Sequence, residues 1–294
     1  MSSLATGRIS LRKCWRYVPE AMSVRLRDLL LGLRELRLGE RPVIVHSSLS
    51  AFGQVEQGAE SVVAALTAVF KTVLVPTFTY KTMLTPRDGP PDNAMVYGSQ
   101  GDLNRMAEFF TLKMPADPLM GVIAEVFRRQ PRALRSSHPI LSFAGVNADA
   151  ILHAQTMADP LAPLAALEAQ DGWVVLLGVN HTVNTSIHYA EKLAGRRTFL
   201  RWALTPKGVV ECPGFPGCSA GFQDIAIDME RFAHRVQIGN AIVQALPLKM
   251  LFRMVIGIIK KDRLALLCQQ ADCERCNQIR ASQGKKDLPE LLHR

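Results

Sequence analysis

A histidine and a glutamate three positions apart, His188 and Glu191, have a spacing that suits acid–base chemistry. Both fall in the segment Ser186–Leu193, which we expect to be helical, so the two side chains lie on one helix face. A carboxylate beside an imidazole fixes the tautomer and stabilises the protonated form, as a general base requires. A pair on a solvated helix face has the same spacing, so spacing alone does not decide between the two interpretations.

A small, hydroxyl-rich turn follows the first predicted strand, with the sequence His46-Ser47-Ser48-Leu49-Ser50-Ala51-Phe52-Gly53. Hydroxyls and backbone amides in such a turn can hold phosphate groups. An ordinary polar turn that caps a helix has the same composition, so this alternative stays open. The turn lacks the lysine and glycine pattern of a P-loop, and no Gly-x-Gly-x-x-Gly occurs in the chain. Nucleotide hydrolysis and dinucleotide binding therefore lose support.

The cysteines after residue 211 have a spacing that suggests metal binding. Cys273 and Cys276 form a Cys-x-x-Cys pair, and four residues separate Cys268 from Cys273. Four thiolates suit a tetrahedral structural zinc ion. Our predicted ligands are Cys218, Cys268, Cys273 and Cys276, with Cys212 as the substitute fourth ligand. Reduced thiols without a metal are an equal alternative, because two well-separated segments must converge.

Short apolar runs that alternate with amphipathic segments indicate which elements position these residues. Strands are predicted at 42–45, 72–76, 140–146 and 173–179, and helices at 23–38, 59–70, 121–129, 148–155 and 186–193. This alternation is typical of a parallel α/β sheet, in which ligands bind at the carboxyl ends of the strands. His46 ends one strand and His188 opens the helix after another, so the two can share a cleft.

The remaining segments are less regular. Residues 79–114 are predicted to form a long excursion, an irregular loop on the substrate side. Structureless loops of this length are uncommon unless they are functional. Residues 198–204 and 208–212 predict a hairpin, and the chain is expected to be mostly helical from Gln223 onward. We expect a single domain over residues 1–294, with a core of about 20–212 and a helical, cysteine-containing C-terminal part of about 213–294.

Composition narrows the function classes. The net charge is +9, but basic residues are spread along the chain and aromatic residues make up only 6%, so we expect no nucleic-acid partner. A positive field suits an anionic cofactor instead. No apolar run approaches the ~20 residues of a membrane span, and none follows the basic N-terminus, so we expect a cytoplasmic protein without a membrane partner. The six cysteines are then not expected to form disulfides, and Cys14 is expected to be a free thiol.

Five motifs in order resemble the aminoglycoside 3-N-acetyltransferase family, and they cover roughly residues 41 to 200. They are Val45–Gly53, Val75–Thr79, Met120–Glu125 with Phe127-Arg128, Arg135–Pro139 followed by Ser142-Phe143, and Leu176–Val179 followed by Asn184–Glu191. The chain is identified as a member of that family. The resemblance implies a three-layer α/β/α fold with a mostly parallel or mixed sheet, and an acyl-coenzyme A as donor.

The resemblance also implies roles for individual residues. His188 would be the general base, with Glu191 as its supporting partner. The turn Ser47–Gly53, including Ser48, Leu49, Ser50 and Phe52, would bind the diphosphate and pantetheine arm of the cofactor. His46 would be the third catalytic residue and would line the cleft together with Thr77, His138 and Thr185. Of these, Thr77 would lie on the cofactor side and His138 and Thr185 on the substrate side.

The function we expect is transfer of an acetyl or longer acyl group from acyl-CoA to an amine of an aminoglycoside or a related amino sugar or amino metabolite. A site for a polycationic drug requires clustered carboxylates, but acidic and basic residues in the segment 79–114 are nearly equal in number. The alternative is a non-catalytic, metal-stapled interaction protein on the same fold. The sequence leaves the acceptor, the acyl length and a homodimer open.

Overall fold

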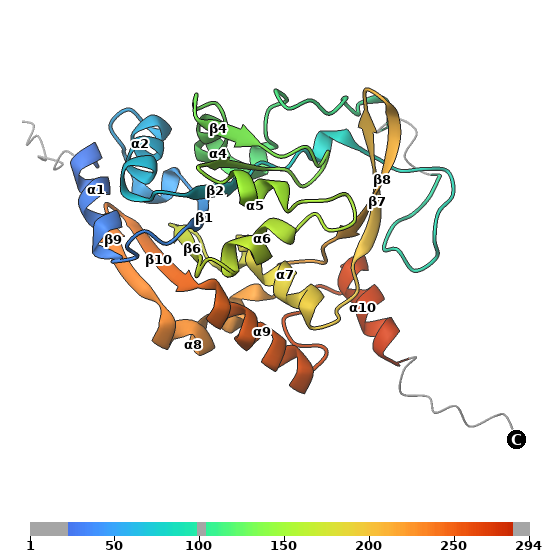
Figure 1. Ribbon diagram of the computed structural model, residues 1–294. Helices are drawn as coiled ribbons and strands as arrows, with labels where there is room; N and C mark the ends of the chain where they lie inside the picture. Colours follow the sequence, from blue (N-terminus) through green and yellow to red (C-terminus); the bar gives the residue numbers. More distant parts are fainter. Residues whose placement is uncertain (1–22, 99–103, 285–294) are drawn as a thin grey trace, which may run out of the picture.

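The computed structural model describes residues 23–98 and 104–284, so Cys14 lies outside the described residues (Figure 1). A seven-stranded sheet with helices on both faces forms the centre of the molecule, which confirms the predicted three-layer α/β/α class. Its strands are β1 (Val43–Ser47), β2 (Val73–Pro76), β4 (Ala133–Arg135), β5 (Phe143–Val146), β6 (Trp173–Leu177), β9 (His234–Ile238) and β10 (Ala241–Pro247).

The sheet is mixed, with the order β4-β5-β2-β1-β6-β10-β9. The three strands β2, β1 and β6 are parallel, whereas β4, β5, β10 and β9 add antiparallel pairs on either side. The predicted parallel core is thus confirmed, and it is extended by antiparallel strands at both edges.

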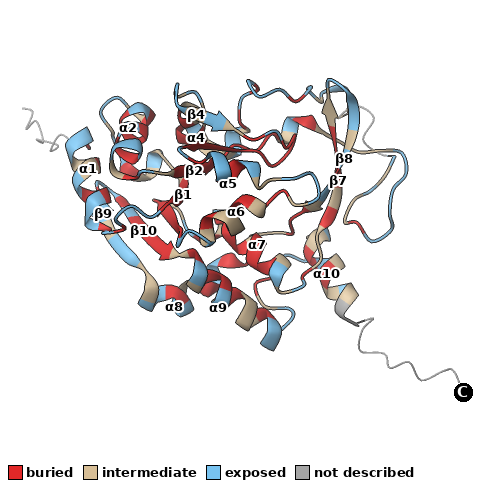
Figure 2. Ribbon diagram, in the orientation of Figure 1, coloured by how far each residue is buried: buried red, intermediate tan, exposed pale blue. Residues whose placement is uncertain are grey.

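Both faces of the sheet are buried, which is why its central strands are continuous apolar runs rather than alternating ones. In β1, Val43 and Val45 pack into one hydrophobic cluster and Ile44 packs into the other. The first face is covered by α1 (Leu26–Glu35), α2 (Ala59–Val69) and α4 (Gly121–Arg128), and the second by α5 (Asp149–His153), α6 (Ala162–Glu168), α7 (Thr185–Leu193) and α9 (Leu248–Lys261). Figure 2 shows the buried residues concentrated in these strands and on the inward faces of the helices.

A smaller antiparallel sheet stands beside the main one. It consists of β3 (Met83–Leu84), β7 (Phe199–Thr205) and β8 (Gly208–Phe215), and β7 and β8 form the predicted hairpin. The described parts of the 79–114 excursion contribute β3 to this sheet and otherwise hold little regular structure.

The C-terminal part is less helical than expected. It contains α8 (Ala226–Met229), α9 and α10 (Glu274–Gly284), but β9 and β10 form an antiparallel hairpin on β6. The prediction of a mostly helical segment from Gln223 is therefore wrong for residues 234–247. The Gly239-Asn240 turn was the signal for this hairpin, because Gly-Asn between two short apolar segments favours a two-residue loop. Gly239 has φ +56°, and a Cβ there would lie 2.5 Å from the Phe52 carbonyl oxygen.

Across residues 23–98 and 104–284, every helix is too short or too polar to span a bilayer.

Candidate active site

The register of two parallel strands brings the serine-rich turn next to the helix that carries His188. In this register His46 of β1 pairs with Leu176 of β6, and Ser47 pairs with Leu177. The chain leaves both strands at the same sheet edge, as expected for the binding edge of an α/β sheet. After β6 a short turn leads into α7, where the Asn184 side chain caps the helix by accepting the backbone N–H of Ser186.

His188 lies in the first turns of α7, and its ring contacts Glu191 one turn further on. The Nδ1 atom of His188 is 2.8 Å from Oε2 of Glu191, and both side chains are about nine-tenths buried or more. The edge of the Phe222 ring packs against the imidazole, with 4.6 Å between the ring centroids. The carboxylate thus fixes Nδ1 as a donor, and Nε2 is the ring nitrogen left to take a proton from a substrate.

Glu191 is held in turn by a buried arginine that sequence reasoning missed. The Nη1 atom of Arg196 donates to Oε1 of Glu191 over 2.6 Å, and its Nη2 atom donates to the carbonyl oxygens of Arg263 and Ala265 over 2.9 and 2.8 Å. Arg196 follows the end of α7, so the helical i, i+3 and i, i+4 spacings could not reveal it. A buried His188–Glu191–Arg196 chain results.

His46 is the second histidine at this edge, and it is neutral at physiological pH. It is buried at the end of β1, and burial lowers its pKa to about 3. Its Nε2 atom is buried without a hydrogen-bond partner. A buried polar atom of this kind is costly unless something satisfies it, so His46 suits a hydrogen bond to a bound ligand rather than proton exchange.

A cavity of about 330 Å³ joins these residues, and we call it the His188 cavity. Its volume is in the range of small-molecule sites. Its polar lining includes His46, Ser47, Asn184, Thr185 and His188. Most of the remaining lining is apolar, namely Val45, Val75, Pro76, Phe78, Leu119, Met120, Ala124, Val179, Val183, Phe215 and Pro216, and Tyr80, Thr182, Gly217, Ser219 and Arg275 complete it.

The serine-rich turn faces a second, adjoining cavity of about 640 Å³, which we call the serine-turn cavity. It is lined by Ser47, Ser48, Leu49, Ser50 and Gly53, and it shares Ser47, Leu119, Val179 and Val183 with the His188 cavity. The hydroxyls of Ser48 and Ser50 are 3.0 Å apart on its surface. Gly53 has φ +82°, a conformation that favours glycine.

Three predicted site residues lie elsewhere. Phe52 is 1% exposed and packs in the hydrophobic core beneath the turn. The Thr77 hydroxyl donates to the Ser142 carbonyl oxygen over 3.1 Å, and this fully buried residue lines neither cavity. His138 accepts the backbone N–H of Leu141 at Nδ1 over 3.0 Å and lines a different cavity with Arg135. The structure therefore does not bring these three to His188, whereas it does bring His46 and Thr185.

One short motif could suggest a serine nucleophile. Residues Gly217 to Gly221 have the Gly-x-Ser-x-Gly spacing of a nucleophile elbow, with Ser219 at its centre. An elbow joins a strand directly to a helix and presents its serine to a histidine. Here the motif lies in the irregular segment after β8, and within the described residues no hydrogen bond joins Ser219 to an imidazole. Within the described residues Ser219 therefore lacks the arrangement of a nucleophile elbow.

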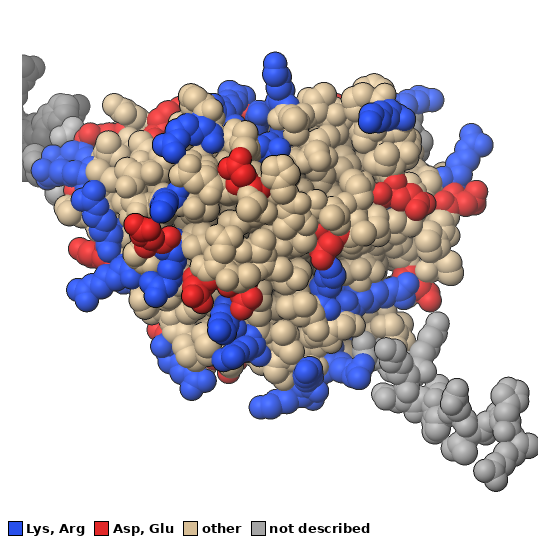
Figure 3. All heavy atoms as spheres, in the orientation of Figure 1, with Lys and Arg blue, Asp and Glu red and all other residues tan. Residues whose placement is uncertain are grey.

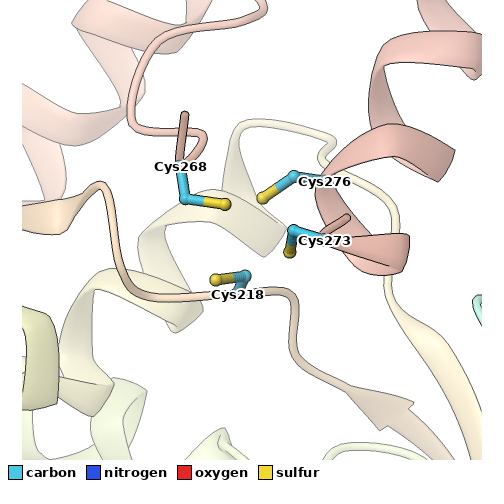
Figure 4. A group of neighbouring side chains, drawn as sticks. All are labelled: Cys218, Cys268, Cys273 and Cys276. Carbon is cyan, nitrogen blue, oxygen red and sulfur yellow. The ribbon is translucent and has the colours of Figure 1, made fainter. Parts of the chain in front are cut away.

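Four cysteines converge beside this cavity. Cys218 comes from the segment after β8 and Cys268 from the loop after α9. Cys273 immediately precedes α10 and Cys276 lies in its first turn, and the four sulfurs point toward one another (Figure 4). The four Sγ atoms lie within 4.8 Å of one another. We call them the cysteine cluster. They are the four cysteines predicted from spacing, whereas Cys212 is buried in the core and is not part of the group.

The electrostatics of the cluster differ between its members. Burial opposes ionisation of Cys273, but hydrogen bonds from the Cys276 backbone and from neighbouring thiols outweigh it, so the pKa of Cys273 is lowered. Burial raises the pKa of Cys218. Four sulfur atoms around one point are the donor set that tetrahedral Zn²⁺ prefers.

Comparison with known proteins places these features in a family. The profile of the aminoglycoside 3-N-acetyltransferase family matches residues 44–260. Aminoglycoside N(3)-acetyltransferase IV from Salmonella sp is 31% identical over 171 residues, covering 54% of this chain and 56% of that protein. Aminoglycoside N(3)-acetyltransferase VII from Streptomyces paromomycinus is 34% identical over 171 residues and is covered to 58%. The aligned region thus spans little more than half the length of these curated relatives.

The structural match extends further. The apoenzyme of aminoglycoside acetyltransferase AAC(3)-IVa superposes with a TM-score of 0.70 and 25% identity, over 89% of this chain and 98% of that one. A binary complex of AAC-IIIb with CoASH superposes with a TM-score of 0.65, over 82% of this chain and 97% of that one. Its 20% identity supports the shared fold alone.

Proposed function

Since this chain belongs to the aminoglycoside 3-N-acetyltransferase family, we propose that it transfers an acyl group from acyl-CoA to an amine. The observation that carries this proposal is the His188–Glu191 pair. His188 lines the His188 cavity, and this cavity shares four lining residues with the serine-turn cavity. The acceptor is an amine of an aminoglycoside or of a related amino sugar or amino metabolite. Relatives with the aminoglycoside N(3)-acetyltransferase name support this class.

The volume and the hydroxyl-rich lining of the serine-turn cavity support it as the site for acyl-CoA, and acetyl-CoA is the simplest donor. The small side chains of Ser48 and Ser50 leave room for a pantetheine arm, and their hydroxyls can donate to phosphate oxygens. The N-terminus of α4, at Gly121, borders the same cavity and carries the positive end of a helix dipole. When bound, acyl-CoA supplies the thioester carbon that the acceptor nitrogen attacks.

The residues of this chain then move one proton and hold the reacting groups. Nε2 of His188 removes a proton from the acceptor nitrogen while the new C–N bond forms. As the C–S bond breaks, the same proton passes to the departing sulfur. Glu191 stabilises the protonated ring through Nδ1, and Arg196 keeps Glu191 in place. The Thr185 hydroxyl, on the lining of the same cavity, can donate to the carbonyl oxygen as negative charge develops.

Surface charge supports a small-molecule role over a nucleic-acid one. Figure 3 shows Lys and Arg side chains scattered over the visible face with Asp and Glu between them, rather than collected in one stripe. A nucleic-acid site would need a concentrated basic face.

We also propose that the cysteine cluster binds one structural Zn²⁺ ion. A tetrahedral zinc site with Zn–S bonds of about 2.3 Å has sulfurs about 3.8 Å apart, so thiols within 4.8 Å need only a small contraction. Such an ion would fasten the start of α10 to the segment after β8. The homodimer that the sequence leaves open is likewise a proposal, and light scattering would distinguish it from the 32.4 kDa chain.

The test of the proposed function is release of free CoA thiol from acetyl-CoA when amines are added. The panel should contain an aminoglycoside, a neutral amino sugar and simple amino metabolites. Amine-dependent thiol release above the slow hydrolysis without amine supports the proposal. No acceleration by any amine, together with no CoA binding in a calorimetric titration, rejects it in favour of a non-catalytic protein.

A further inference from the structure

The charge of the His188 cavity is unusual for a site that takes a polycation. Of the described residues that line it, Arg275 is the one with a permanent charge, and none is an aspartate or glutamate. A site for several ammonium groups needs carboxylates, because each buried positive charge must be paired. The lining offers a guanidinium instead.

Two carboxylates close to this lining are hydrogen-bonded to other groups. Glu191 is bonded to both His188 and Arg196. Asp117 and Arg275 both influence the pKa of Tyr80, which lines the cavity, and Oδ1 of Asp117 accepts the backbone N–H of Leu119. The two carboxylates hold the walls of the cavity in place, and neither lines it.

A hydrogen bond positions Arg275 at the cavity wall. It lies between Cys273 and Cys276 of the cysteine cluster, and its Nη1 donates to the Gly217 carbonyl oxygen over 2.9 Å. Gly217 in turn precedes Cys218, so the cluster fixes both the arginine and its partner. This bond uses one of five guanidinium N–H donors. A pre-positioned planar fork of this kind suits a carboxylate or phosphate.

Arg275 is placed to contact the acceptor rather than the phosphates of CoA. It lines the His188 cavity but not the serine-turn cavity, whereas Ser48 and Ser50 line the second and not the first. The same cavity is lined mainly by apolar residues, among them Phe215 and Pro216 on the segment that leads to Gly217.

We propose that the acceptor is a primary amine that also carries an anionic carboxylate or phosphate group, which Arg275 binds while His188 deprotonates the amine. This inference rests on the proposed acyl transfer and narrows its acceptor class to anionic amino metabolites. It makes Arg275 a specificity-determining residue that a polycationic drug would meet as a like charge.

The test uses acceptors that differ in one charge. 6-Aminohexanoate, its amide and 1,6-diaminohexane share a chain and end in a negative, a neutral and a positive group, and glucosamine 6-phosphate pairs with glucosamine. In the CoA-thiol assay with saturating acetyl-CoA, the anionic member of at least one set should have a kcat/KM about tenfold or more above its neutral partner. The difference should lie mainly in KM.

Variants distinguish a direct contact between Arg275 and the acceptor from a general effect of the positive charge of the protein. Arg275→Gln should reduce the anionic-to-neutral ratio to near one, whereas Arg275→Lys, which keeps the charge, should retain part of it. Arg132→Gln removes the same charge from an exposed side chain away from the cavity and should leave the ratio unchanged. Equal ratios in wild type and Arg275→Gln overturn the inference, as does a loss of CoA affinity in that variant with the ratio preserved.

Failure of this inference is distinguishable from failure of the proposed function. Thiol release that is faster with an aminoglycoside or with 1,6-diaminohexane than with both 6-aminohexanoate and glucosamine 6-phosphate overturns the anionic acceptor and keeps acyl transfer. If no probe is turned over, calorimetric titration of 6-aminohexanoate and its amide into CoA-saturated protein tests whether the anion site exists. If 6-aminohexanoate binds in an Arg275-dependent way and its amide does not, the anion site is supported without acyl transfer. Equal binding of the two compounds, or binding of neither, overturns the anion site.

Discussion

Arg196 lies 2.6 Å from the carboxylate of Glu191, on the oxygen that His188 does not use. The guanidinium and the imidazole thus share one buried carboxylate, and two backbone carbonyl oxygens hold the guanidinium from behind. This arrangement gives His188 a fixed ring orientation and a fixed proton position, which the proposed base needs.

Replacing Glu191 with Gln tests the positioning role. The amide keeps the shape but cannot stabilise a protonated imidazole, so kcat should fall by about ten- to a hundredfold. The KM for acetyl-CoA should stay within about twofold, because the side chain lies behind the histidine. Steady-state kinetics check this, with the exposed Glu60→Gln as the control. A kcat equal to wild type would remove Glu191 from the mechanism.

Replacing Arg196 with Met should act on stability as well as on rate. It leaves the 4%-exposed Glu191 without its cationic partner, and breaking a buried ion pair costs about 3 kcal/mol or more. Urea denaturation should show this loss in the free energy of unfolding. The double variant with Glu191→Gln should recover part of it, since no charge is then left unpaired. If Arg196→Met were as stable as wild type, the buried ion pair between Arg196 and Glu191 would be contradicted.

Bulky residues in the serine-rich turn should block the cofactor. Ser50→Trp places a bulky ring in the serine-turn cavity and should raise the Kd for CoA by about tenfold or more. A tenfold rise corresponds to a loss of about 1.4 kcal/mol of binding free energy. Ser137→Trp, at an exposed serine on a different cavity, is the matched control. Isothermal titration measures both. Unchanged CoA affinity in Ser50→Trp would refute the placement of the cofactor.

Metal content tests the cysteine cluster. Purified wild type and Cys212→Ala should each contain about one zinc per chain, and Cys276→Ser should contain far less and unfold at a lower temperature. Elemental analysis by mass spectrometry reports the stoichiometry. Folded wild-type protein that carries neither zinc nor another thiophilic metal would refute the site.

Acid should destabilise the protein through buried histidines. Burial lowers the pKa of His138 to about 4, below the ordinary value of 6.5. Because the folded pKa is the lower one, the contribution to stability is complete above pH 6.5 and is lost as the pH falls toward 4. At pH 5 this loss is about 2 kcal/mol for one such histidine.

The variant His138→Asn isolates that contribution. An asparagine oxygen can replace Nδ1 as acceptor for the backbone N–H groups of Ile140 and Leu141 but does not titrate. The difference in unfolding free energy between pH 7.5 and pH 5 should shrink by about 2 kcal/mol. His153→Asn, at an exposed histidine on the same cavity, should leave the difference unchanged. An unaltered pH dependence in His138→Asn would contradict the assignment.

Sequence patterns predicted the parts of this molecule that local rules govern. Continuous apolar runs identified β1, β2 and β6, and the rule on strand ends placed the serine-rich turn and His188 at one edge. Cysteine spacing selected the four clustered thiols. The β9–β10 hairpin was missed because its apolar residues were read as helical, although the Gly239-Asn240 turn marked it.

Other features depend on contacts between distant segments, which no local pattern encodes. Arg196 reaches Glu191 from beyond the helix end, and Arg275 of α10 reaches the cavity where it bonds to Gly217, in the segment after β8. Conversely, Thr77 belongs to one of the motifs, but its hydroxyl donates to the Ser142 carbonyl oxygen. A motif position shows that a residue belongs to the fold and leaves open which way its side chain points.

The most direct test of the account is the turnover of the His188→Gln variant with its CoA affinity measured in parallel. Loss of the imidazole should lower kcat for amine-dependent thiol release by at least about a hundredfold, while the Kd for CoA stays within about twofold of wild type. Turnover that persists at the wild-type rate in a variant that still binds CoA would contradict the role of His188 as the base.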